Sequence, residues 1–68
     1  MKLFKVDTIY ETINSIEEYM DLIIANSKEE AEEKVTENCT DNILSCVAYE
    51  ILEVEGYKII LEKVGEDL

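Results

Sequence analysis

The fold of this chain is decided by residues 21–35, DLIIANSKEEAEEKV, where a strand gives way to a helix. The apolar run stops at Asn26, and Ser27 stands where the helix would begin. A serine hydroxyl in this position accepts a hydrogen bond from the N–H of Glu30, and the Glu30 carboxylate reaches back to the N–H of Ser27. This capping box predicts a strand that ends at Asn26 and a helix that runs from Ser27 to about Asn38.

Alternating apolar and polar residues predict strands on both sides of the helix. Residues 2–11 and 17–25 are joined by a short polar link and are expected to pair as a hairpin. Residues 43–54 and 57–64 are expected to form a second hairpin around a tight turn at Glu55-Gly56, where glycine can take a positive φ. The prediction is an α+β fold in which a four-stranded, mostly antiparallel sheet (ββαββ) carries one helix on one face. At 68 residues the chain is expected to be a single domain, residues 1–68. The expected core comprises Phe4, Val6, Tyr10, Met20, Leu22, Ile24, Ala31, Val35, Val47, Ile51, Ile59 and Leu61.

The predicted strands carry apolar residues on both faces, and one short helix cannot cover two faces of a sheet. An uncovered apolar face favours self-association, either sheet on sheet or through edge strands. The alternatives are a different partner protein, or scattered surface residues that need no partner. The residues expected on this second face, and therefore in a homodimer interface, are Leu3, Ile9, Tyr19, Ile23 and Ile60.

The charge of the chain is strongly acidic. Seventeen Asp and Glu residues face six lysines, with no Arg and no His, for a net charge of −11. Direct binding of DNA or RNA is excluded on these grounds, because phosphates would be repelled and arginine, the preferred phosphate ligand, is absent. The same charge would attract a basic protein surface, including one that normally holds nucleic acid. The alternative is that the acidity serves only solubility. The acidic residues expected to meet a partner are Glu29, Glu30, Glu32, Glu33 and Glu37 on the helix, with Glu53 and Glu55 near the last turn.

Residue types needed for catalysis are missing. The chain lacks His, the commonest general base, and its two cysteines cannot close a zinc site alone. We therefore expect no enzyme activity, no metal and no cofactor. Cys39 and Cys46 are expected to be free thiols in a reducing compartment. With no long apolar run and no signal-peptide pattern, we expect a cytoplasmic protein that does not enter a membrane.

The segment Ala25-Asn26-Ser27-Lys28-Glu29-Glu30-Ala31-Glu32-Glu33-Lys34-Val35 resembles small proteins of phages and mobile elements. In those proteins a strand that ends in a small residue precedes S-x-E-E-A-x-x-x-V, and more strands follow; the DpnD/PcfM-like group is one example. The resemblance covers the middle third of the chain. It implies a compact α+β accessory protein and carries over no functional site. In size and charge the chain also resembles acidic anti-CRISPR proteins, some of which imitate nucleic acid.

Two non-enzymatic hypotheses follow from these patterns; a third, a carboxylate enzyme, would need a concave pocket that holds two acids with raised pKa values. The first is a non-enzymatic interaction module, encoded by a phage or mobile element, that binds and inhibits a basic nucleic-acid-binding protein. The second is a homodimeric structural or accessory protein whose acidity serves only solubility.

Overall fold

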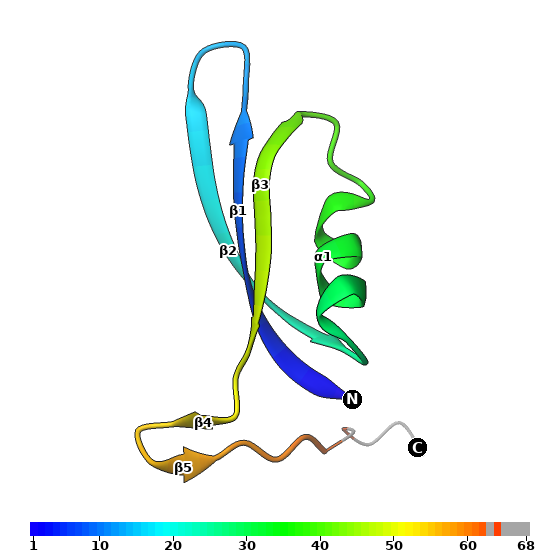
Figure 1. Cartoon of the computed structure of the whole chain (residues 1–68), viewed down its shortest axis with the longest axis vertical. Helices are drawn as coiled ribbons and strands as arrows, with labels where there is room; N and C mark the ends of the chain where they lie inside the picture. Colours follow the sequence, from blue (N-terminus) through cyan, green and yellow to red (C-terminus); the bar gives the residue numbers. More distant parts are fainter. Residues whose placement is uncertain (63, 65–68) are drawn as a thin grey trace.

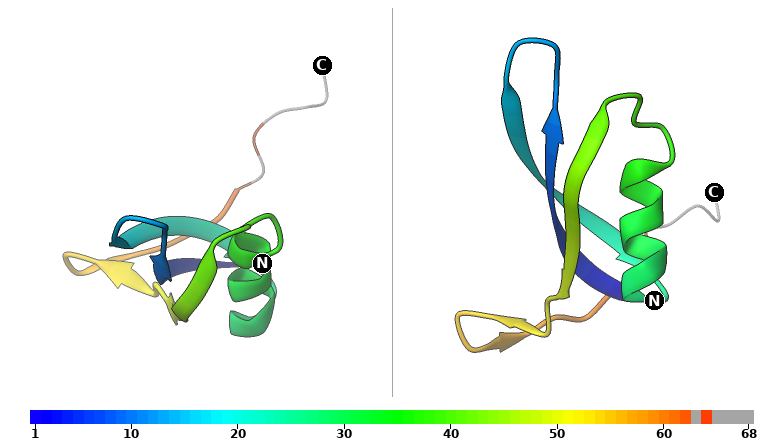
Figure 2. Two further views of the ribbon diagram at one scale, coloured as in Figure 1. Left: turned by 90° about the horizontal axis from the view of Figure 1, so that it is seen from above. Right: turned by 45° about the horizontal axis from the view of Figure 1, so that its top comes forward.

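A computed structural model describes residues 1–62 and 64 of the chain. Its elements are β1 (Lys2–Glu11), β2 (Ile16–Ala25), α1 (Lys28–Thr36), β3 (Asn42–Glu50), β4 (Glu53–Val54) and β5 (Tyr57–Lys58) (Figure 1). The first three strands form an antiparallel sheet in the order β2-β1-β3, and β4 and β5 form a separate two-stranded sheet. The α1 helix lies against one face of the larger sheet (Figure 2). The predicted α+β class with a single helix is therefore confirmed.

The predicted four-stranded sheet is wrong in its last hairpin. The third strand was expected to continue to residue 54, but β3 ends at Glu50. The cause is the register with β1, because Glu50 lies opposite Phe4 and β1 begins at Lys2. The Ile51 N–H still donates to the carbonyl oxygen of Leu3 at 2.8 Å, and beyond this point β1 has almost no backbone left to pair with.

After this point the chain turns back on itself instead of adding a fourth strand to the sheet. Glu55 and Gly56 both have positive φ, of 51° and 83°, as the tight type I′ hairpin turn requires. The residues after the turn therefore pair with β4, and this small hairpin projects from the sheet at the end opposite the β1–β2 loop (Figure 1). Of the predicted strand 57–64, only Tyr57–Lys58 is a strand; Lys63 lies outside the described residues.

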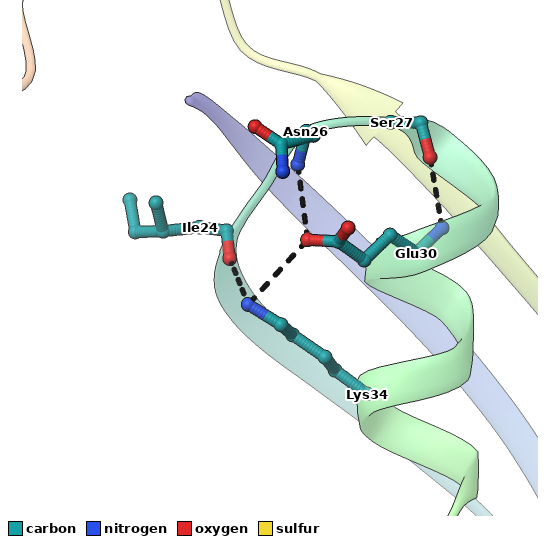
Figure 3. A network of polar contacts seen from close by, with 5 residues as sticks. All are labelled: Ile24, Asn26, Ser27, Glu30 and Lys34. Atoms are coloured by element: carbon teal, nitrogen blue, oxygen red, sulfur yellow. Dashed lines mark hydrogen bonds and ion pairs between the residues drawn. The ribbon is translucent and has the colours of Figure 1, made fainter.

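The predicted capping box forms with one change of partner (Figure 3). The Ser27 hydroxyl accepts from the Glu30 N–H at 3.1 Å, as expected. The Glu30 carboxylate accepts from the N–H of Asn26, also at 3.1 Å, and not from that of Ser27. Lys34 pairs with the Glu30 carboxylate at 3.7 Å and donates to the carbonyl oxygen of Ile24 at 2.7 Å. These contacts bind the first turns of α1 to the end of β2.

Replacing Ser27 with alanine is expected to lower the free energy of unfolding by about 1 kcal/mol, because the Glu30 N–H loses its partner. Urea denaturation followed by circular dichroism measures this change. Ser45→Ala, a matched control in the middle of β3, should change the stability by less than about 0.5 kcal/mol. Equal losses in the two variants would show that the cap does not stabilise the helix.

The core lies between α1 and the sheet and is built from small side chains. Its buried apolar residues are Phe4, Val6, Ala25, Ala31 and Ala48, with Ile23, Val35 and Cys46 packed against them. Alanines on the helix and on both outer strands let α1 approach the sheet closely. The buried Thr8 hydroxyl lies 3.8 Å from the Cys46 sulfur, so it has a polar partner inside this core.

The two faces of β2 are opposite to those predicted. Glu11 lies opposite Ile16, so the odd-numbered residues of β2 lie beside the even-numbered residues of β1 on the helix side. Ile23 therefore packs against the core, although it was expected on the second face. Tyr19 also lies on the helix side, where its ring stacks on Tyr10. The residues of β2 that were expected in the core, Met20, Leu22 and Ile24, are exposed on the opposite face.

Candidate interaction surfaces

The glutamates of α1 fall into two groups, of which the first stabilises the fold. Glu30 caps the helix and pairs with Lys34. Glu32 accepts a 2.9 Å hydrogen bond from the Ala48 N–H, which joins the helix to the outer edge of β3. Both side chains are partly buried. These two of the five predicted partner-binding helix residues are therefore engaged within the chain itself.

The second group forms an exposed row along the helix. Glu29, Glu33 and Glu37 are spaced four residues apart, so they lie on one side of α1 at intervals of about 6 Å along its axis. We call these three residues the acidic stripe. Among the residues that the structure describes, none of the three takes part in an ion pair. The acidic stripe therefore presents uncompensated charge to solvent.

The remaining two predicted acidic residues lie elsewhere. Glu53 is in β4 and Glu55 is in the turn that follows, and both are exposed. The β4–β5 hairpin lies beyond the end of the sheet, whereas α1 lies against one face of it (Figures 1 and 2). Glu53 and Glu55 therefore belong to a different element from the acidic stripe.

The lysines do little to balance the acidic stripe. Three of them pair with other carboxylates: Lys2 with Glu50 at 4.0 Å, Lys5 with Asp7 at 3.5 Å, and Lys34 with Glu30 at 3.7 Å. All three pairs are partly exposed, so each adds little stability. They do, however, direct half of the six lysines of the chain toward acids outside the stripe.

The face of the sheet away from α1 carries a second candidate surface, which we call the open face. Its register places Leu3 and Ile9 there, as predicted, together with residues that were expected in the core. At its centre Lys5 pairs with Asp7 and lies 5.4 Å from the ring centre of Tyr49. The apolar side chains of the open face are Leu3, Ile9, Ile16, Met20, Leu22, Ile24, Val47 and Tyr49.

The predicted self-association residues are therefore not all together. Leu3 and Ile9 lie on the open face, whereas Tyr19 and Ile23 lie on the helix side. Ile60 follows β5 and is 77% exposed, outside both sheets. Leu22, which is 61% exposed, is a better marker of the open face than Ile23.

A third surface is a cleft of about 280 Å³ beside the C-terminal end of α1. Its walls include Tyr10, Tyr19, Asp21, Cys39 and Asp41. The two tyrosine rings are stacked, with centres 5.3 Å apart and planes 9° from parallel. A hydrogen bond with Tyr19, partial desolvation and the negative charge of nearby carboxylates raise the pKa of Tyr10 to about 12. Sequence reasoning missed this cleft, because its residues come from four separate segments.

The remaining observations concern the two cysteines, possible metal sites, membrane-spanning helices and similar proteins. Cys39 and Cys46 are free thiols. Within residues 1–62 and 64, no group of three or more His, Cys, Asp or Glu side chains is arranged to hold a metal ion. In the same part of the chain, no helix is long and apolar enough to cross a membrane. The chain matches no protein-family model, no curated protein and no solved structure.

Proposed function

We propose that this chain is a non-enzymatic interaction module that binds and inhibits a basic nucleic-acid-binding protein. The observation that carries the proposal is the acidic stripe of Glu29, Glu33 and Glu37, which is exposed and lacks ion pairs in the described residues. A protein surface that holds nucleic acid is lined with Lys and Arg, so a regular row of carboxylates can take the place of phosphates there. The resemblance of residues 25–35 to small proteins of phages and mobile elements implies only an accessory protein, whereas the likeness to acidic anti-CRISPR proteins in size and charge agrees with an inhibitory role.

The net charge of the whole chain supports the same proposal, because it would increase the rate of association with a basic partner. A net charge of −11 on 68 residues produces a long-range attraction toward a basic surface. The helix then supplies a rigid support, since its N-terminus is bound to β2 and Glu32 joins its middle to β3. The backbone positions of the three glutamates are therefore at fixed spacing before the partner arrives, which lowers the entropic cost of binding.

The proposal is tested first by the salt dependence of binding. Immobilised chain is exposed to a cell lysate at about 0.01 M and 0.15 M salt, where the screening lengths are roughly 30 Å and 8 Å. A basic protein retained only at the lower salt is then purified, and its dissociation constant is measured. Failure to retain any basic, salt-sensitive protein would count against the proposal.

The Glu33→Gln/Glu37→Gln variant is expected to bind the purified partner roughly 5- to 30-fold more weakly, because two exposed ion pairs are lost. These two positions are preferred to Glu29, because Glu29 also stabilises the first turn of the helix. The matched control is Glu53→Gln/Glu55→Gln, which removes the same charge from the separate hairpin. Equal weakening by both variants would show that net charge, and not the acidic stripe, determines binding.

The second candidate function is that of a homodimeric structural or accessory protein whose acidity serves only solubility. The open face favours it, because Met20, Leu22 and Ile24 are 57%, 61% and 40% exposed on one side of the sheet. Two copies that pack these faces about a two-fold axis would bury apolar area on both. The Lys5–Asp7 pair at the centre of the face carries both signs of charge, so it can complement its own copy.

A further inference from the structure

The cleft beside the end of α1 exists because the helix is shorter than the sheet that it covers. The helix ends at Thr36, while β1 and β2 continue toward the loop of residues 12–15 (Figure 1). On the helix side of this extension Tyr10 and Tyr19 take the place of core residues. The chain segment that leads from α1 to β3 forms the other wall and contributes Asp41.

The side chains that line the cleft include two aromatic rings and two carboxylates, and none of them is a cation. Asp21 comes from β2 and Asp41 from the segment between α1 and β3, and none of the lining residues is a lysine. The negative charge reaches the aromatic floor, since Glu17 and Asp41 both contribute to the raised pKa of Tyr10. A volume of about 280 Å³ lies just below the range of small-molecule pockets, which suits one side chain better than a cofactor.

We propose that this cleft binds an arginine side chain presented by the basic partner, with its guanidinium stacked on the tyrosine pair and bonded to Asp21 and Asp41. This inference rests on the proposed function and adds that the partner presents an arginine at the contact surface. Arginine fits better than lysine, because its flat guanidinium can stack on an aromatic face and form forked hydrogen bonds with a carboxylate. The compact ammonium of lysine carries the same charge but cannot stack on an aromatic face or form forked hydrogen bonds.

The test compares capped oligoarginine and oligolysine peptides of equal length and charge as probes. We expect the wild-type chain to bind oligoarginine several-fold more tightly than oligolysine, with amide NMR shifts concentrated at Tyr10, Tyr19 and Asp41. The Asp21→Asn/Asp41→Asn variant keeps the shape of both side chains and should bind oligoarginine roughly tenfold more weakly. It should also lose the preference for arginine over lysine.

The matched control is Glu33→Gln/Glu37→Gln, which removes the same charge outside the cleft and should keep the arginine preference. Tyr19→Leu provides a second variant that leaves the charge unchanged and should also abolish the preference. Equal affinity of the wild-type chain for the two peptides overturns the inference, as does equal loss of arginine preference in the two charge variants. If the purified partner binds in a salt-sensitive way but Asp21→Asn/Asp41→Asn leaves that binding intact, the cleft inference fails while the proposed function stands.

Discussion

Replacing Phe4 with alanine is expected to remove a large part or all of the free energy of unfolding at room temperature. Phe4 is only 3% exposed and is the largest side chain of a core that otherwise consists of valine and alanines. Truncating a buried phenylalanine costs about 3–5 kcal/mol. A chain of this length has a total stability of roughly 3–10 kcal/mol, so the loss is comparable with the whole. Urea denaturation monitored by circular dichroism measures the change.

Leu22→Ala is the matched control for Phe4→Ala, because it also removes a large side chain from the same sheet. Leu22 lies on the open face and is 61% exposed, so its truncation should cost less than about 1 kcal/mol. Both variants are measured at two protein concentrations, since a loss that depends on concentration reports association and not the core. If, at high dilution, Leu22→Ala loses more free energy of unfolding than Phe4→Ala does, the core has been placed on the wrong face of the sheet.

Ile23→Glu is expected to destabilise the fold by about 3 kcal/mol or more, whereas Leu22→Glu should leave it folded. Ile23 lies opposite Phe4 on the helix side and packs against the core, so Ile23→Glu places a carboxylate among apolar side chains. Leu22 points to the open face, where a carboxylate stays in water. Thermal melts followed by circular dichroism distinguish the two adjacent substitutions.

The same pair of variants decides whether the chain forms a homodimer. If the wild-type chain sediments as a dimer and Leu22→Glu as a folded monomer, the open face is the interface. If the wild-type chain sediments as a monomer at micromolar concentration, the homodimer function is contradicted. A folded Ile23→Glu together with an unfolded Leu22→Glu would contradict the register of the β1–β2 hairpin.

The helix and the first hairpin could be predicted from the sequence because their signals are local. Ser27 and Glu30 are three residues apart, and the polar residues of the cap end the apolar run of residues 22–25. The faces of β2 could not be predicted in this way. Tyr19 and Ile23 on one face, and Met20 and Leu22 on the other, are both apolar, so alternation does not say which set is buried. The buried face of β2 is determined by the loop of residues 12–15, where the Thr12 hydroxyl accepts hydrogen bonds from the N–H groups of Asn14 and Ser15. This loop sets the register in which β2 pairs with β1.

The end of β3 and the role of Glu32 depend on tertiary contacts. Residues 51–54 have the composition of a strand, but the strand ends where β1 begins. Glu32 could not be told from its neighbours on the helix, because its partner, the Ala48 N–H, lies sixteen residues away in the sequence. The acidic stripe can be recognised only once the structure shows that Glu30 and Glu32 make contacts within the chain.

The most direct test of the proposed function is displacement by nucleic acid. The basic partner, once purified, is immobilised and loaded with the chain at low salt, and duplex DNA is then added. If the chain occupies the site that normally holds nucleic acid, DNA should release it in proportion to the DNA's own affinity for the partner. If the chain stays bound while DNA binds beside it, the acidic surface does not act in place of nucleic acid and the proposed function is contradicted.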